Sequence, residues 1–340
     1  MRRLITVFAF VALASGGADA CSYPKGAFLK LLDAWAASCG HPLCGKFYAP
    51  DQSRIRQNPP PCDADTWLTL KDELKETVAQ GGLVLAGEVH DNPKHHELRA
   101  LLGLGNYPAV VFEQLSRDQT SALDAFAVKI AGKVNEKSLD EFKAALDWDK
   151  SGWSKYAYEP LLRAALLAQH PIFAGDAPQE LIKKIASEGA VAMPVDMISK
   201  LKLDVALGGK ADAASGAEID EAHCGMIPKT AIPNMALAQR YRDATLADSV
   251  VEAMSKHHSA LLLAGNNHVR TDRGVPWYVR ARMPTKKIIS IMLLEVEDGK
   301  TEAEAYVPKD PDGKPAVDYI IFTPRAQRGG VCDGMKKKAE

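Results

Sequence analysis

The sequence predicts an open α/β fold, in which helices flank a mostly parallel sheet and a smaller helical subdomain is attached. Four short apolar runs support this prediction, because such runs are typical of strands that are covered on both faces. They occupy residues 83–86, 109–112, 171–174 and 260–264. Amphipathic helical patterns separate the runs, and this alternation of strand and helix is typical of a parallel sheet.

The remaining elements follow in chain order. Residues 67–79 have helical spacing, which Gly81 and Gly82 end before the first strand. Asn92-Pro93 begins a helix over residues 93–102. Further helices are predicted at 119–130, 139–146, 160–169, 179–187 and 235–257, and closing strands at a sheet edge are predicted at 288–296 and 319–322. Residues 191–229 break the alternation, so we assign 191–257 to an inserted helical subdomain.

The N-terminus predicts export. Arg2 and Arg3 precede an apolar run at 4–13, and Ala18-Asp19-Ala20 fits a signal-peptidase site, so residues 1–20 are predicted to be a signal peptide. We expect the protein in the periplasm or associated with the outer membrane. Cys21 follows the cleavage site, but Asp19 stands where lipidated proteins usually have a small apolar residue. A lipid anchor on Cys21 is therefore the less favoured alternative.

Composition and cysteines limit the remaining classes. The chain has 42 Lys and Arg against 43 Asp and Glu, which gives no basic excess for binding nucleic acid. In an oxidising compartment the six cysteines can form disulfides, and their pairing stays open. They are Cys21, Cys39, Cys44, Cys62, Cys224 and Cys332. We assign 21–66 to a Cys/Pro-rich extension, 67–190 with 258–332 to the α/β domain, and 333–340 to a basic tail.

Polar residues follow the predicted strands. Glu88 and His90 follow the first strand, Glu113 follows the second, and His268 follows the fourth. The carboxyl ends of parallel strands meet at one edge of a sheet, where ligands bind, so we expect these side chains to lie close together. Two imidazoles and two carboxylates can hold a divalent transition metal, activate water, or act as acid and base without a metal. A buried hydrogen-bonded network is the alternative interpretation.

The motifs around these residues resemble a known family. They are GEVH at 87–90 followed by DNPKHH at 91–96, FEQ at 112–114, and GNNHVRTDRGVP at 265–276. Segments at 151–160, 223–226, 239–244 and 318–324 add further matches. Together they resemble the ChaN-like branch of the haem-binding uptake and Tiki superfamily, over residues 83–332.

The resemblance implies an iron-acquisition protein that binds haem through a tyrosine, as a homodimer, and that works with an outer-membrane uptake receptor. Other branches of the superfamily are hydrolases. The alternative is therefore a metal-dependent hydrolase, of the Tiki peptidase or esterase kind, that uses Glu88, His90, Glu113 and His268. Enzyme activity stays open at this point.

Candidates for haem contact come from the same motifs. Tyr158 and Tyr156 lie in an aromatic segment, and either phenol could bind ferric haem, with Tyr158 preferred. Packing in the core is the alternative for both. Of the neighbours His95 and His96, we expect one, assigned as His96, to face the site, and the other to be solvated or to pair with Asp91.

Two further candidates lie later in the chain. His223 could reach the iron or a propionate, although a turn held by a Cys224–Cys332 disulfide is an equal interpretation. Arg270 could pair with a haem propionate, because a guanidinium suits carboxylate recognition. A surface salt bridge is the alternative for Arg270.

Overall fold

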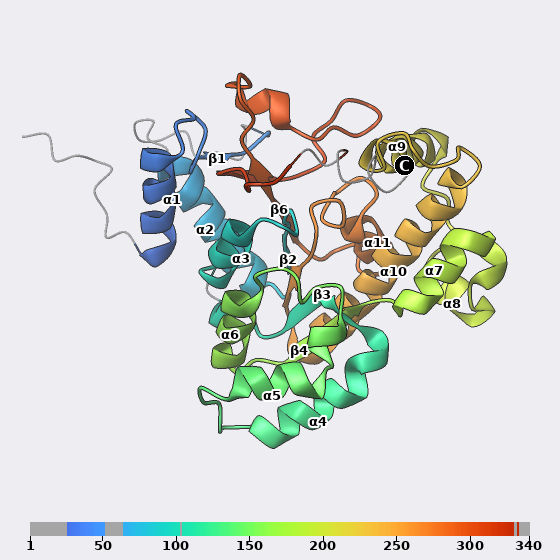
Figure 1. Ribbon diagram of the computed structural model, residues 1–340, viewed down its shortest axis with the longest axis horizontal. Helices are drawn as coiled ribbons and strands as arrows, with labels where there is room; N and C mark the ends of the chain where they lie inside the picture. Colours follow the sequence, from blue (N-terminus) through green and yellow to red (C-terminus); the bar gives the residue numbers. More distant parts are fainter. Residues whose placement is uncertain (1–25, 52–63, 103, 330–331, 333–340) are drawn as a thin grey trace, which may run out of the picture.

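The computed structural model describes residues 26–51, 64–102, 104–329 and 332, which form an α/β fold around a seven-stranded sheet (Figure 1). The strand order is β1-β7-β6-β2-β5-β3-β4, and every neighbouring pair is parallel except β1 with β7. The strands are β1 (Phe47–Tyr48), β2 (Leu83–Ala86), β3 (Val110–Ser116), β4 (Ile172–Asp176), β5 (Ala260–Leu263), β6 (Ile288–Glu295) and β7 (Tyr319–Thr323). The predicted fold class is confirmed.

The central strands are apolar because both of their faces are covered. Every residue of β2 and β5 is buried, and the two strands run in parallel register from Leu83 beside Ala260 to Ala86 beside Leu263. β3 lies on the far side of β5. The chain therefore leaves β2, β5 and β3 at adjacent points on one edge of the sheet.

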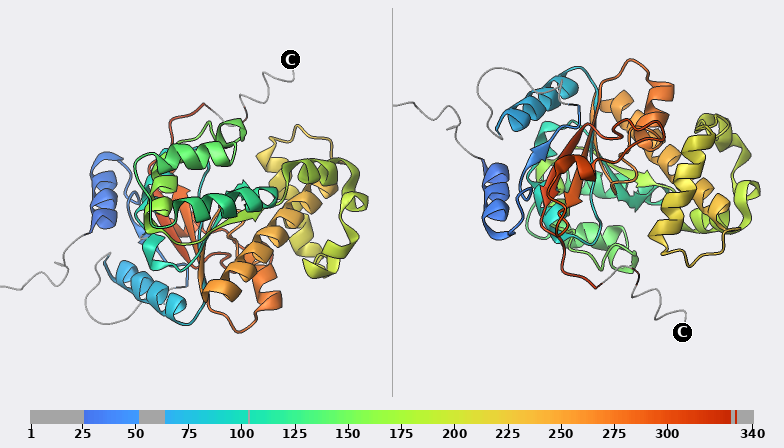
Figure 2. Two further views of the ribbon diagram at one scale, coloured as in Figure 1. Left: turned by 90° about the horizontal axis from the view of Figure 1, so that it is seen from below. Right: turned by 90° about the horizontal axis from the view of Figure 1, so that it is seen from above.

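Helices cover both faces of the sheet. In Figure 2, α2 (Ala64–Ala79), α10 (Ile232–His257) and α11 (Val275–Arg282) lie on one face, and α3 (Pro93–Ala100), α5 (Ser138–Ala145) and α6 (Glu159–Ala168) lie on the other. The remaining helices are α1 (Ala27–Ser38), α4 (Thr120–Ile130), α7 (Gln179–Glu188), α8 (Val195–Lys200) and α9 (Gly209–Ala222). Both figures place α1 and the α7–α9 group at opposite ends of the molecule. The boundaries of the inserted subdomain stay a prediction.

The closing strands differ from the prediction in their position. β6 was expected at a sheet edge, but it lies between β2 and β7. Its first six residues are all buried, which requires neighbours on both sides. The edges are β4 and β1, and β1 comes from the N-terminal extension, where sequence analysis predicted no strand.

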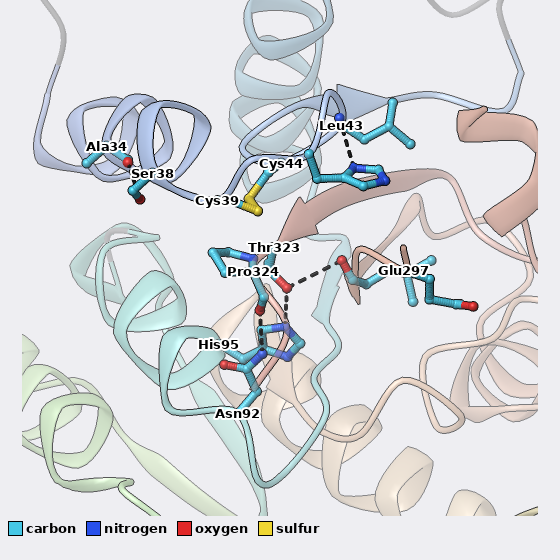
Figure 3. The surroundings of a disulfide bond; sticks show 12 residues. Ala34, Ser38, Cys39, Leu43, Cys44, Asn92, His95, Glu297, Thr323 and Pro324 are labelled. Carbon is cyan, nitrogen blue, oxygen red and sulfur yellow. Dashed lines mark hydrogen bonds between the residues drawn. A yellow bond between two sulfur atoms is a disulfide. The ribbon is translucent and has the colours of Figure 1, made fainter. Parts of the chain in front are cut away.

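The extension contains a disulfide of its own and is held against the rest of the fold by the pairing of β1 with β7 and by an aromatic cluster. Cys39 pairs with Cys44, close to the end of β7 (Figure 3). The rings of Phe28, Phe47 and Trp67 pack together, with centroid separations of 4.9 to 6.1 Å. A second disulfide joins residues 108 positions apart, Cys224 and Cys332.

Several predictions fall on residues outside the described ranges. These are the signal peptide, the pairing of Cys21 and Cys62, and the basic tail. Among the helices in the described part of the chain, none is both long and apolar enough to cross a membrane.

Candidate functional site

The predicted site residues converge at the carboxyl ends of β2, β3 and β5. His90 Nε2 lies 3.7 Å from Glu113 Oε1, and His268 Nε2 lies 3.3 Å from the same oxygen. Glu88 accepts a hydrogen bond from His90 Nδ1 at 2.8 Å. The four residues span 181 positions of sequence, from 88 to 268 inclusive, and form one cluster because parallel strands bring them to one edge.

Two glycines make this convergence sterically feasible. A Cβ on Gly265 would lie 2.7 Å from His90 Nε2, and a Cβ on Gly87 would lie 2.3 Å from Asn266 Oδ1. Both contacts are shorter than van der Waals packing allows. The glycines of the two motifs are therefore needed so that the loops after β2 and β5 can pack against each other.

Glu88 is the centre of a fully buried polar network, the Glu88 network, which also contains His96, Arg99, Gln114 and Tyr158. Arg99 Nη2 donates to Glu88 Oε2, and His96 Nε2 lies 3.2 Å from that oxygen. Tyr158 OH and Gln114 Nε2 both donate to Oε1. Burial alone would raise the pKa of Glu88, but the Arg99 charge and hydrogen bonds from His90 and His96 outweigh it and hold this pKa far below its usual value. Glu88 is therefore a carboxylate whose acceptor sites are already filled.

Glu113 has a similar set of partners on the other side of the site. Its Oε1 accepts from Arg242 Nη2 at 2.6 Å, and its Oε2 accepts from the backbone N–H of Gly265 at 2.6 Å. Arg242 also forms a bidentate pair with Asp176 at the end of β4. Burial opposes ionisation of Glu113, but His268, His90 and Arg242 hold its pKa well below the ordinary value.

His268 is an imidazolium held between two carboxylates. Its Nδ1 lies 2.7 Å from Asp243 Oδ1. Burial disfavours the charged ring, but Glu113 and Asp243 outweigh it and raise the pKa of His268 to about 10. Both ring nitrogens of His268 therefore face protein carboxylates, Nδ1 toward Asp243 and Nε2 toward Glu113.

The metal site made of Glu88, His90, Glu113 and His268 stays a prediction, although the four side chains lie together. Within the described ranges, no three His, Cys, Asp or Glu side chains are arranged to hold a metal ion. The physical reason is that guanidinium groups of Arg99 and Arg242 lie against the two glutamates, where a metal would otherwise bind. As arranged, the donor set fits a charge network.

A cavity of about 600 Å³ opens in front of this cluster. His90 and Arg242 reach its wall, with side chains 31% and 22% exposed. The loop before α6 supplies Trp153, Lys155 and Tyr156. The volume is in the range of small-molecule and cofactor sites.

His90 is the titratable imidazole on the cavity wall. Its Nδ1 is held by Glu88, and its ring makes an edge contact with Trp153 at 4.8 Å between centroids. Burial opposes its ionisation, but Glu113 and Glu88 outweigh it and raise the pKa of His90 above the ordinary value. Because Nδ1 contacts Glu88, Nε2 is the ring nitrogen of His90 that lies toward Glu113.

The two candidate tyrosines occupy different environments. Tyr156 lines the cavity, and none of the hydrogen bonds within the described residues uses its hydroxyl. Lys155 Nζ lies 4.9 Å from the centroid of its ring. Tyr158 is 1% exposed, and burial together with the Glu88 charge raises its pKa far above the ordinary value. The geometry therefore places Tyr156, and not the preferred Tyr158, where a ligand in the cavity could meet a phenol.

Comparison with known proteins agrees with this arrangement. The family model described as "Haem-binding uptake, Tiki superfamily, ChaN" matches residues 74–279. The chain belongs to this family. A comparison with curated protein sequences gives no match.

The comparison with solved structures matches a ChaN protein and an esterase. ChaN of Campylobacter jejuni, solved with cofacial haem, is 21% identical, with a TM-score of 0.52 over 73% of this chain and 90% of that one. An erythromycin esterase, EreC, is 13% identical, with a TM-score of 0.39 over 78% of this chain and 96% of that one. The first likeness confirms the fold of this ChaN-family chain.

The other predicted contact residues lie away from the cavity wall. His223 Nδ1 donates to the carbonyl of Ile219, and its neighbour Cys224 is in the disulfide with Cys332. Arg270 is buried and pairs with Asp272. Neither His223 nor Arg270 lines the cavity. His223 lies at the disulfide-held turn that was the alternative interpretation, whereas Arg270 forms a buried ion pair in place of the surface salt bridge that was its alternative.

The neighbours His95 and His96 are both buried, so the expectation that one is solvated is wrong. His96 stacks on Tyr158 at 4.0 Å and belongs to the Glu88 network. His95 Nδ1 accepts the backbone N–H of Val89 at 2.8 Å, and its Nε2 lies 2.7 Å from Thr323 Oγ1 (Figure 3). His95 therefore fixes the peptide between Glu88 and His90 to the end of β7.

Sequence analysis missed Arg242, Asp243 and Arg99 as members of the site. The first two lie in the middle of α10, and helical spacing alone does not show which polar residues of a long helix point inward. The same limit applies to Arg99, which lies on α3. One signal was present for α10, because residues 239–244 are among the segments that carry the family resemblance.

Proposed function

We propose that this ChaN-family protein binds haem in the cavity at the carboxyl ends of β2, β3 and β4. One observation carries the proposal: the cavity of a haem-binding family member is walled by Trp153 and by Tyr156, whose hydroxyl has no hydrogen bond among the described residues. Aromatic side chains suit a flat apolar ligand, and a phenol is an established type of haem ligand.

Tyr156 is the candidate iron ligand in this proposal. Bound haem would supply a ferric iron that accepts one oxygen donor. Lys155 Nζ lies over the Tyr156 ring in a cation–π contact, whereas the Tyr158 hydroxyl already donates to Glu88. Trp153 would pack against the macrocycle.

Export, a role in iron acquisition, a homodimer and an outer-membrane receptor partner remain parts of the proposal. The Arg2-Arg3 segment with its cleavage pattern supports export, and the family resemblance supports the others. Mass spectrometry of the mature chain tests export directly. A chain that begins at Met1 in the cell envelope would contradict it.

Titration of the purified protein with ferric haem tests the binding proposal. The Soret absorbance should saturate at an integral ratio of haem to protein. Lys183→Ala serves as a matched surface control, because Lys183 pairs only with Glu180 on exposed helix α7. A titration without saturation, in a protein that is folded by circular dichroism, would contradict haem binding.

A hydrolase is the second candidate, and His90 is the observation that favours it. Its Nε2 lies near the cavity beside Glu113, while Glu88 holds its Nδ1, as in a general acid or base that is oriented by a carboxylate. Glu113→Gln separates the two functions. Haem binding should survive this change, because Glu113 lies behind His90, whereas hydrolysis of an ester substrate should be lost.

A further inference from the structure

A second cavity lies along β4, the last strand of the sheet. It has a volume of about 450 Å³, and it is bounded by α4, by the end of α6 and by the last turns of α10. We call it the β4 recess. It shares no lining residue with the haem cavity, because the turn at residues 116–120 separates the two.

The floor of the β4 recess is an unpaired strand edge. In the parallel pairing of β3 with β4, Val110 lies beside Ile172 and donates its N–H to the carbonyl of Pro171. Backbone groups alternate in direction along a strand, so Phe173 faces β3 while Ile172 and Ala174 face away. Within the described residues, no hydrogen bond uses the backbone N–H or C=O groups of Ile172 and Ala174.

The walls of the recess are apolar. Leu123 and Phe126 of α4 are 3% and 4% exposed and face the recess, as do Ile130 and the end of α6 at Leu166. Unpaired backbone groups in apolar surroundings are unfavourable unless a partner or water meets them. Donors and acceptors that alternate along an apolar slot match the backbone of an extended peptide.

Two other occupants fit the recess less well. The cations at its rim, Arg117 and Lys256, both pair with Glu252, at 2.8 and 2.7 Å, and Asp124 adds a second carboxylate to the lining, so these four charges sum to zero and none is left over for the head group of a fatty acid. Ala174 is only 2% exposed, so the edge is recessed between helices. The equally recessed β4 of a second copy could not reach it.

We propose that the β4 recess binds an extended segment of a partner polypeptide, with aliphatic side chains on alternate residues, which pairs with Ile172 and Ala174 as an added strand. The peptide would lie between the β4 edge and α4. This proposal is independent of haem binding, because the two cavities have separate linings.

Binding of a defined peptide to the full chain tests the proposal. The probe is a fluorescent peptide of seven residues. A lysine stands at each end, and the five residues between them alternate between valine and threonine. Its binding is followed by anisotropy, and amide hydrogen exchange is followed by NMR. The peptide should slow exchange at Ile172 and Ala174. A peptide that is N-methylated on the pairing residues should bind at least about tenfold more weakly, because two hydrogen bonds are lost.

The variant Ile172→Pro supplies the matched change in the protein. It removes an outward N–H that β3 does not use, so it should weaken peptide binding while the thermal unfolding midpoint stays close to that of the wild type. Phe126→Ala, in the α4 wall, gives a second variant in case Ile172→Pro does not fold. Saturable binding that depends on the pairing amides supports the proposal.

Other outcomes would overturn the proposal. These are no saturable binding, binding without protection of either amide, a dimer in sedimentation that Ile172→Pro dissociates, or protection in the free chain that disappears when residues 333–340 are removed. The last two would assign the edge to a second copy or to the chain's own tail.

Discussion

The Glu88 network and the cavity wall lie side by side, but their polar groups are in opposite states. In the network, Glu88, Arg99 and Tyr158 are buried and bonded to one another. On the wall, Tyr156 and His90 are partly exposed, and the Tyr156 hydroxyl has no hydrogen bond among the described residues. The difference indicates that the Glu88 network supports the site, while the loop before α6 supplies groups that a ligand can reach.

The strongest test of the network is Arg99→Leu. This change leaves the Glu88 carboxylate buried without its main counter-charge, and breaking such a pair costs about 3–5 kcal/mol of unfolding free energy. Urea unfolding measures the loss. Lys150→Ala, which breaks an exposed pair with Asp147, should leave stability unchanged. A stable Arg99→Leu protein would show that Glu88 is neutral or solvated.

Tyr158→Phe gives a smaller effect on stability. It removes one hydroxyl donor from the buried carboxylate of Glu88, for an expected cost of about 1–3 kcal/mol in urea unfolding. The ferric haem spectrum should not change. A shifted charge-transfer band would return Tyr158 to the role of iron ligand that its sequence position first suggested.

His95 tests how firmly the network is attached to the sheet. Burial, with the Arg99 charge also contributing, lowers the pKa of His95 to about 3, against 6.5 for an ordinary histidine, although Glu88 opposes this shift. Between pH 6.5 and pH 3 the unfolded chain therefore binds a proton at His95 that the folded chain does not. The contribution of neutral His95 to the free energy of unfolding is complete above pH 6.5 and is lost as the pH falls toward 3.

His95→Gln should remove part of that acid sensitivity. Its unfolding free energy should change less between pH 7 and pH 4.5 than that of the wild type does, because no imidazole remains to be protonated at this position. His258→Gln is the control, since the His258 side chain is exposed. An unchanged pH slope would mean that His95 is solvated in the folded protein.

The sequence predicted the fold for a clear physical reason. Runs such as 83–86 and 260–264 are apolar throughout, and such strands must lie in the interior of a parallel sheet. The same reasoning correctly brought His90, Glu113 and His268 to one edge. It failed for β6, because an apolar strand near the end of a chain looks the same whether its partners precede or follow it.

The site was harder to predict in detail. Tyr156 and Tyr158 are two residues apart, and sequence could not show that the loop turns one toward the cavity and the other toward Glu88. Arg99 and Arg242 were missed because a charged residue in a helix is usually solvated. Only the packing of α3 and α10 against the strand ends shows that these two pair with the glutamates.

The ferric haem spectrum of Tyr156→Phe, measured beside that of Tyr158→Phe, tests the central claim most directly. The account predicts that Tyr156→Phe keeps the unfolding free energy of the wild type but loses the phenolate charge-transfer band and weakens haem binding. Tyr158→Phe should lower the unfolding free energy but keep the charge-transfer band and the haem affinity of the wild type. A Tyr156→Phe protein with the wild-type haem spectrum and affinity would contradict the division between a supporting network and a ligand-binding wall.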